Sequence, residues 1–306
     1  MPESVAGDAR RPEALEFEAE AVRFEYGQVV ALEGLTLRVR AGERIALLGA
    51  NGSGKSTLLR LMDGLCFPCR GTLRFRGVAL TEAAMEDDGF AFGFRRRVGL
   101  VFQNPDIQLF NPTVFDEVAF GPLQLGWPRE EILERVHQTL AWIGAEHLKD
   151  RAPYRLSGGE KKRVAIASVM VLDPDVLLLD EPTAMLDPRS QSQVIELLEG
   201  WGDQAENRGA ENRGTENQGA ENRGAENRGR KTIITATHQL EILPEIAGRA
   251  VVLERGGVVA DGTPAEVLAD TALLDSANLI HSHRHLHGGV AHRHLSPFLR
   301  HEHPKH

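Results

Sequence analysis

Apolar and polar residues alternate along two stretches near the start of the chain, residues 15–40 and residues 70–80. A two-residue period is typical of strands with one buried face, and Tyr26 with Gly27 marks a turn inside the first stretch. The pattern predicts a small antiparallel sheet. Residues 1–15 are polar and of mixed charge, which predicts a disordered lead-in.

Continuous apolar runs and helical spacings take over in the rest of the chain. Short apolar runs without alternation are typical of buried parallel strands, and they occupy residues 44–48, 98–102, 176–180 and 232–237. Apolar residues three and four apart predict helices at residues 56–62, 113–120, 129–143, 161–170, 191–201 and 264–268, and a hairpin is expected within 251–259. This order of strands and helices predicts an α/β fold with a mainly parallel sheet flanked by helices.

Two segments lie outside this pattern. Residues 205–229 are a five-residue repeat of the type Ala-Glu-Asn-Arg-Gly, with no aromatic or branched aliphatic side chain. Such a segment cannot bury a core, so we expect a disordered, dispensable insertion between a helix and a strand. Residues 271–306 form a carboxyl-terminal extension, and its tail from 281 onward carries nine of the twelve histidines.

The composition limits the classes of function. The 306 residues are 42% hydrophobic and carry a formal net charge of −9, which argues against non-specific nucleic-acid binding. The cysteines, Cys66 and Cys69, imply no disulfide framework and are interpreted as ordinary loop thiols rather than a zinc site. No apolar run approaches the roughly 20 residues of a membrane span. We therefore expect a soluble chain that other chains hold at any membrane it serves.

A phosphate-binding loop is the clearest chemical signal. Residues 49–57 fit G-x-x-x-x-G-K-[ST] between a predicted strand and a predicted helix. Glycines let the backbone approach a polyphosphate, and the N–H groups of a helix start bind anions. Lys55 is expected to reach the β- and γ-phosphates, and the Ser56 hydroxyl to join a Mg²⁺ shell. The nucleotide-binding candidates here are Gly49, Asn51, Gly52, Ser53, Gly54, Lys55, Ser56 and Thr57.

Two acids end the apolar run at 176–180 and extend one residue beyond it. Asp180, at the carboxyl end of a strand, is placed to hold Mg²⁺ through water, and Glu181 beside it can polarise an attacking water. An ordinary strand end with exposed acids is the alternative, and the phosphate loop in the same chain disfavours it.

A second anion-binding helix start follows from Ser157, Gly158 and Gly159, which open the predicted helix at 161–170. If the intervening helices form a separate lobe, the two helix starts cannot serve one nucleotide. The simplest solution is a pair of chains facing head to tail, each completing the other's site.

In the set and order of these motifs, the chain resembles the ATP-binding subunit of ABC transporters over about residues 16–270. The resemblance matches residues 49–57 to Walker A, Gln103 to the Q-loop, 156–160 to the signature motif, 176–181 to Walker B, 184–187 to the D-loop and His238 to the switch histidine. Glu160 departs from the glutamine that many members carry. The implied fold is a P-loop NTPase core with a small antiparallel β subdomain and a helical signature subdomain at about 104–165.

The resemblance also implies roles for individual residues. ATP lies between Walker A of one subunit and Ser157, Gly158 and Gly159 of the other, with Tyr26 stacked on adenine. Asp187 of the D-loop is also among the implied nucleotide-binding residues. A plain strand-end tyrosine is the alternative for Tyr26. The implied Mg²⁺ shell involves Ser56, Gln103 and Asp180. Glu181 acts as general base, His238 positions the γ-phosphate and water, and Lys55 and Gln103 complete the catalytic set.

Within the family, the likeness is closest to the ATPases of energy-coupling-factor and cobalt/nickel importers. Residues 104–110, 113–122, 157–163 and 183–188 carry it. It implies an ATP hydrolase coupled to transport, peripheral on the cytoplasmic face of the cell membrane. The implied partners are a second ATPase subunit, either a copy of this chain or a paralogue, and integral membrane subunits that contact residues 104–122.

The histidine tail is the sequence's only indication of cargo. His281, His283, His285 and His287 are separated by single residues and could chelate one transition-metal ion, since imidazole suits Ni²⁺ and Co²⁺. A solubilising polar tail is the alternative. A nickel or cobalt importer is therefore the favoured function; a vitamin importer of the same type and a soluble, non-transport ABC ATPase stay open.

Overall fold

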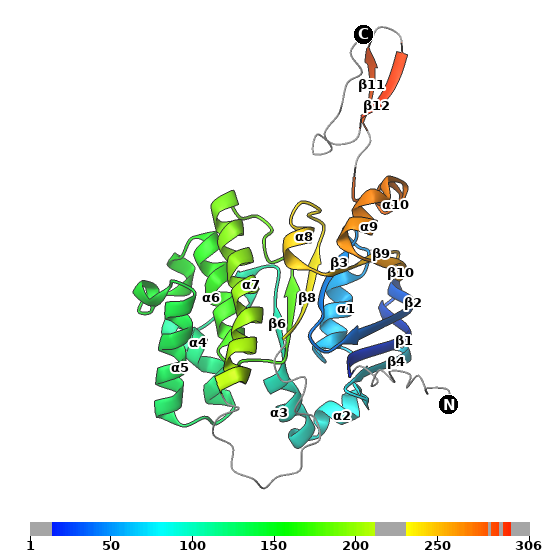
Figure 1. Ribbon diagram of the computed structural model, residues 1–306. Helices are drawn as coiled ribbons and strands as arrows, with labels where there is room; N and C mark the ends of the chain where they lie inside the picture. Colours follow the sequence, from blue (N-terminus) through cyan, green and yellow to red (C-terminus); the bar gives the residue numbers. More distant parts are fainter. Residues whose placement is uncertain (1–13, 212–230, 281–282, 288–289, 295–306) are drawn as a thin grey trace, which may run out of the picture.

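A mostly parallel sheet forms the centre of the protein (Figure 1). The computed structural model describes residues 14–211, 231–280, 283–287 and 290–294, with the backbone alone described at 202–211 and in the last two segments. The strand order is β10-β9-β3-β8-β7-β6, in which β10 alone pairs antiparallel. The strands are β3 Arg44–Leu48, β6 Val98–Val101, β7 Val176–Asp180, β8 Thr232–Thr237, β9 Arg249–Glu254 and β10 Gly257–Gly262.

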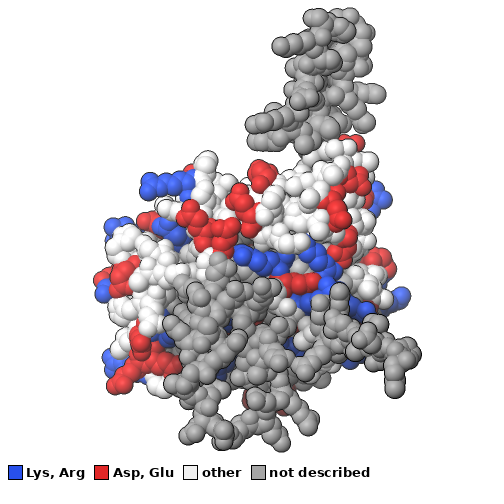
Figure 2. Space-filling model, viewed as in Figure 1, with Lys and Arg blue, Asp and Glu red and all other residues white. Residues whose placement is uncertain are grey.

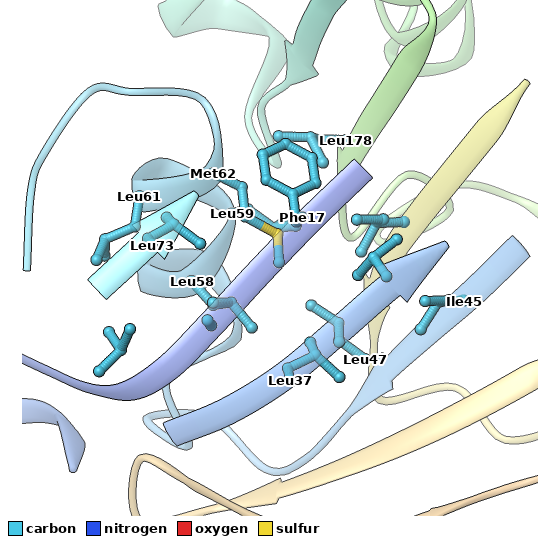
Figure 3. Close-up of a cluster of buried hydrophobic side chains, with 14 of the residues drawn as sticks. Phe17, Leu37, Ile45, Leu47, Leu58, Leu59, Leu61, Met62, Leu73 and Leu178 are labelled. Carbon is cyan, nitrogen blue, oxygen red and sulfur yellow. The ribbon is translucent and has the colours of Figure 1, made fainter. Parts of the chain in front are cut away.

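A second sheet is antiparallel and packs on helix α1, Lys55–Met62. Its order is β2-β1-β4-β5, from β1 Leu15–Tyr26, β2 Val29–Arg40, β4 Arg70–Phe75 and β5 Val78–Ala79. Figure 3 shows Phe17 of this sheet, Met62 of α1 and Leu178 of the central sheet in one buried cluster. Because α1 is enclosed between the two sheets, its amino end has a fixed position.

The helical part follows β6 in sequence and has its own core. Its helices are α4 Val114–Gln124, α5 Arg129–Trp142, α6 Gly158–Met170 and α7 Pro188–Glu211, with single 3₁₀ turns at Pro105–Ile107, Glu146–Leu148 and Pro153–Arg155. Side chains of α4, α5, α6 and α7 pack with β7 in a second buried cluster. Thr113 caps α4, because its hydroxyl accepts from the Asp116 N–H at 3.1 Å.

Short helices follow β8 and β10 in the chain and pack against the central sheet. They are α8 Leu243–Ile246, α9 Pro264–Ala269 and α10 Thr271–Ser276, and they share a third buried cluster with β3 and β9. Strands β11 His283–His287 and β12 Val290–His294 then pair in an antiparallel hairpin. On the face seen in Figure 2, acidic and basic side chains are interspersed over the described surface.

The predicted fold class is confirmed: a mainly parallel core, a small antiparallel sheet and helices. No helix among the described residues is long and apolar enough to cross a membrane.

Two helices, α2 Glu82–Glu86 and α3 Asp88–Arg97, have no counterpart in the prediction. Gly89 and Gly93 weaken the helical pattern of α3. Tertiary packing compensates, because the Phe94 ring meets Phe75 edge-on at 5.2 Å and stacks on Phe90. Helix α3 was missed because its glycines weaken the helical pattern and because its contact with Phe75 lies outside the helix.

Helix α7 continues beyond the predicted end at Trp201 to Glu211, so the first residues of the 205–229 repeat are helical rather than disordered. The repeat lacks core-forming side chains, yet its Ala and Glu residues favour helix. Residues 212–229 and the lead-in 1–13 lie outside the described residues. The segments on the two sides of the insertion are in contact, since the Lys231 ammonium lies 5.5 Å from the centre of a Trp201 ring.

Asp63, at the carboxyl end of α1, generates a prediction about stability. Burial raises the pKa of its carboxyl group to about 8, against the opposing effect of the Arg95 charge. The unfolded chain has the ordinary, lower pKa, so it binds fewer protons than the folded chain between about pH 4 and pH 8. This group therefore destabilises the fold increasingly as the pH rises through that window.

We expect Asp63→Asn to stabilise the protein more at pH 8.5 than at pH 5.5, because the amide has no charge to bury. The effect is measured as the difference in melting temperature between Asp63→Asn and the wild type from pH 5.5 to pH 8.5. Asp150→Asn makes the same exchange at an exposed site and serves as the control. Equal pH profiles for Asp63→Asn and the wild type would contradict the assignment.

Candidate functional site

The loop between β3 and α1 is shaped by close backbone contacts. Gly49 has φ of 153°, and a Cβ built there would lie 2.5 Å from the Leu253 carbonyl oxygen. Gly54 has φ of 106°, and a Cβ there would lie 2.7 Å from the Ala31 carbonyl oxygen. Gly52 has φ of 84° in open space. Glycine is therefore required at 49 and 54 by lack of room as well as by backbone conformation.

The start of α1 has unused hydrogen-bonding capacity. No side chain of the described residues caps this amino end, and the buried Ser53 hydroxyl has no hydrogen-bond partner among them. The buried Lys55 ammonium donates to the carbonyl oxygens of Gly49 at 2.6 Å and Ala50 at 3.2 Å, so it curls back over the loop. An uncapped helix start, an unpaired hydroxyl and a cation form a cradle for an anion.

Carboxylates from the end of β7 and a histidine from the end of β8 lie beside this cradle. The Ser56 hydroxyl donates to Asp180 Oδ1 at 2.9 Å, joining the helix start to the end of β7. Glu181 lies against His238, which follows β8, with Glu181 Oε1 2.8 Å from His238 Nδ1. Glu181 also has φ of 46°, a conformation that costs a non-glycine residue on the order of 1–3 kcal/mol and is common at functional sites.

Burial acts on the charges of this cluster. It lowers the pKa of Lys55, which the charges of Glu181 and Asp180 oppose. Burial also raises the pKa of Asp180, which the Ser56 hydrogen bond opposes. A hydroxyl and a carboxylate oxygen side by side are donors that suit Mg²⁺, and a bound cation would offset the cost of the buried carboxylate. The residues present thus fit a magnesium ion, with Ser56 and Asp180 as the oxygen donors.

Other candidates lie around the cradle at the surface. Tyr26 is exposed at the end of β1, where its hydroxyl accepts from Arg60 at 3.2 Å and its ring meets Phe24 edge-on. Gln103 is exposed just after β6. Among the remaining loop residues Asn51 is exposed and Thr57 is buried.

The second predicted helix start is assembled elsewhere. Ser157 caps α6 in a reciprocal pair with Glu160, and Gly158 and Gly159 form its first turn. A Cβ at Gly159 would lie 2.5 Å from Ser190 Oγ, and Ser190 in turn donates to Asp187 at 2.6 Å. Ser157, Gly158, Gly159 and Asp187 therefore form a second group at the starts of α6 and α7. Figure 1 shows β6 and β8 between this helical part and α1.

The sequence-based prediction missed residues whose hydrogen bonds hold the backbone around the site. Lys162 of α6 is buried, and its ammonium donates to the backbone after β6, at Phe102 and Gln103. Burial lowers the pKa of Lys162 to about 8. Thr183 bonds Gln239 at 2.5 Å, joining the chain after β7 to the chain after β8. No motif marks these residues; a lysine in an otherwise apolar helix face was the available signal for Lys162.

Comparisons with known proteins bear on the family of the chain. The family described as ABC transporter matches residues 32–184. The nickel import ATP-binding protein NikO of Rhodobacter capsulatus is 54% identical over 86% of this chain and 95% of its own length. The energy-coupling factor transporter ATP-binding protein EcfA of Methanocaldococcus jannaschii is 38% identical over 84% of this chain and 81% of its own length.

Two solved structures share the fold. The structure of cbiO1 from Clostridium perfringens, part of the ABC transporter complex cbiONQ, has a TM-score of 0.67 at 35% identity over 87% of this chain and 96% of that chain. The ATP-binding cassette MJ0796, a dimer bound to ADP and Pi after hydrolysis, has a TM-score of 0.65 at 24% identity over 81% of this chain and 98% of that chain. The second likeness bears on the fold alone.

The chain belongs to the ABC transporter family. It is an ATP-binding subunit, an enzyme whose hydrolysis of ATP is coupled to transport. Its relatives include importer ATPases of the nickel and energy-coupling-factor groups.

The crowded position of Gly49 yields a prediction. Gly49→Ala should abolish ATP binding and lower the melting temperature, because the added Cβ collides with Ser53 and the Leu253 carbonyl. Gly77→Ala is the matched control: its φ is also positive, at 82°, but no atom lies within 4 Å of the added Cβ. We expect the control to bind ATP normally with a small loss of stability, about 1 kcal/mol. Normal nucleotide affinity in Gly49→Ala would contradict the proposed shape of the loop.

Proposed function

We propose that this chain is the ATPase of an energy-coupling-factor-type importer of nickel or cobalt ions. The observation that supports it most is the 54% identity to a nickel import ATP-binding protein over 86% of this chain and 95% of that protein. The acids, cation and hydroxyls that ATP hydrolysis needs are also present together at the carboxyl edge of the central sheet.

The geometry supports a separate role in ATP hydrolysis for each of these residues. Lys55 would turn from the loop carbonyls to the γ-phosphate. Ser56, Asp180 and Gln103 would hold Mg²⁺, which would neutralise phosphate charge. Glu181 takes the proton of the attacking water, and His238 holds Glu181 in place and contacts the γ-phosphate. Tyr26 stacks on the adenine, and its exposed ring and hydroxyl are suited to that contact.

The working unit is a head-to-tail pair of ATPase subunits, either two copies of this chain or this chain and a paralogue. Its basis is the separation of the two glycine-bearing helix starts, at α1 and α6, within one chain. In the pair, Ser157, Gly158 and Gly159 of each subunit close over the nucleotide held by the other. The exposed Met185 and Asp187, just before α7, lie at the same boundary.

Integral membrane subunits dock on the segment after β6. Ile107 and Phe110 are 66% and 67% exposed, and Phe110 meets Phe120 edge-on at 5.0 Å. The buried Glu117 carboxylate accepts from the backbone N–H groups of Phe110 and Asn111, which presents the Phe110 ring outward. A preformed apolar patch on a chain without membrane helices in its described part suits a peripheral subunit at the cytoplasmic face.

The tail supports metal as the cargo class. In the hairpin, His285 is the register partner of His292, and His283 of His294. A two-residue period places His287 on the same face as His283 and His285. Histidines that share a face across a strand pair can bind one transition-metal ion, so the tail is suited to hold the cargo ion near the importer. His281 lies outside the described residues.

Glu181→Gln tests the catalytic assignment. The amide keeps the size of the side chain and an acceptor for His238 but cannot take a proton. ATP affinity should stay within a few fold, while turnover falls by about 100-fold or more. Glu241→Gln, an exposed change near His238 in sequence, should leave both unchanged. Turnover near the wild-type rate would remove Glu181 from the role of base.

Titration of Ni²⁺ and Co²⁺ tests whether the tail binds the metal ions that we propose as cargo. The full chain should bind at least one more ion than a truncation ending at residue 280, measured by calorimetry. His285→Ala with His292→Ala should weaken binding, whereas Arg284→Ala with Arg293→Ala, the register pair between them, should not. Equal stoichiometry in the full chain and the truncation would identify the tail as a polar extension without a metal role.

A further inference from the structure

Lys162 is a buried cation that the hydrolysis mechanism does not use. Its side chain is 1% exposed, and its ammonium donates to the carbonyl oxygens of Phe102 at 3.2 Å and Gln103 at 2.6 Å. Burying an ammonium is costly unless its hydrogen bonds are made. Both acceptors belong to the backbone just after β6, so Lys162 ties the backbone at Gln103 to helix α6.

Gln108 makes a second tie between the same two segments. Its Nε2 donates to the Ala165 carbonyl at 2.8 Å and to Ser168 Oγ at 3.1 Å, both on α6. Its Oε1 accepts from the Phe102 N–H at 3.1 Å. One amide thus bonds the end of β6 and the middle of α6 at once. Gln108 and Lys162 together hold residues 102–108 against α6, and we call this set of contacts the α6 strap.

Lys161 adds an outer contact, with its ammonium 2.6 Å from Asp106 Oδ1. Asp106 is mostly exposed, and exposed ion pairs contribute little because water and salt screen them. The α6 strap therefore depends on the two inner side chains, Lys162 and Gln108.

The strap connects two places that serve different nucleotides in the proposed pair of subunits. Gln103 follows β6 at the edge that carries Asp180 and Glu181, the site built by this chain's own phosphate loop. Ser157, Gly158 and Gly159 start α6, and in the head-to-tail pair they face the partner's nucleotide. Lys162 lies about one turn from that start.

We propose that Lys162 is a positioning residue that couples the two ATP sites of the assembled pair, by making Gln103 and the start of α6 move as one body. The proposal rests on the head-to-tail pairing of the proposed function. When ATP and Mg²⁺ draw Gln103 toward one site, α6 must follow, because separation would leave the buried ammonium without acceptors. The same movement sets Ser157, Gly158 and Gly159 on the nucleotide of the other site.

Mixed pairs test the positioning role in trans. One subunit is wild type, and the other carries Glu181→Gln, which binds ATP without hydrolysing it. Turnover then comes from the wild-type phosphate loop, to which the variant subunit supplies α6. Adding Lys162→Met to the Glu181→Gln subunit should lower this turnover by about tenfold or more, because small misplacements of catalytic contacts are costly. Lys149→Met is the matched control, since Lys149 pairs with Glu146 at the surface and touches neither site.

A third mixed pair separates failure of this inference from failure of the proposed pairing. Ser157→Arg in the Glu181→Gln subunit should abolish turnover if α6 acts in trans. Full activity with Ser157→Arg would overturn the pairing and the inference with it. Loss with Ser157→Arg but equal activity with Lys162→Met and Lys149→Met would overturn the role of Lys162 alone.

Pairs of identical variant subunits test the coupling between the two ATP sites directly. They need no turnover from a single site. Lys162→Met should leave the ATP affinity of the separate subunit unchanged, lower kcat, and reduce the Hill coefficient for ATP toward 1. Lys162→Gln, which keeps two N–H donors, should restore part of the cooperativity. Gln108→Leu should act in the same direction without removing a charge. A Hill coefficient equal to that of the wild type in Lys162→Met and Gln108→Leu would contradict the coupling.

Discussion

Strand β3 is hydrogen-bonded on both sides, to β8 and to β9, and the nucleotide site depends on that position. The loop that begins at Gly49 follows directly after its carboxyl end. The Leu253 carbonyl of β9 lies so close to Gly49 that no side chain fits there. On the other side, β8 separates β3 from β7 and sets the gap across which Ser56 meets Asp180. The sheet thereby fixes a cation, a hydroxyl and two carboxylates within one small volume.

That volume is electrostatically unfavourable when it holds no nucleotide. Lys55 is held by carbonyl oxygens rather than by a full counter-charge, and Asp180 is buried beside Glu181. Such an arrangement costs stability in the free protein and is relieved by a ligand that brings both a cation and an anion. Magnesium and a polyphosphate supply that pair of charges. The strained backbone of Glu181 fits the same view, in which the site is organised for its ligand before the ligand arrives.

Much of this could be predicted from the sequence, because the informative residues act locally. The loop glycines, the acids after β7 and the Ser157 cap of α6 each depend on neighbours within a few residues, so their patterns can be read directly. The Lys162 and Gln108 contacts could not be predicted, since their partners at 102–103 and on α6 are about 60 residues apart. Helix α3 was missed because Gly89 and Gly93 weaken its pattern, while the Phe75 ring that packs on it lies in another element. Helix α7 extends beyond its predicted end because a segment without core-forming side chains can still form a helix.

The sheet order also dictates when the site can be made during synthesis. Both neighbours of β3 come from the last quarter of the chain, residues 232–254, beyond the repeat insertion. Until the ribosome has released them, the strand that ends in the phosphate loop has bare edges on both sides and the loop lacks its supporting carbonyl. Contacts between such distant segments form slowly and leave apolar strands open to aggregation. The nascent chain therefore cannot complete the support of its phosphate loop until β9 has left the ribosome, and the repeat lengthens that interval.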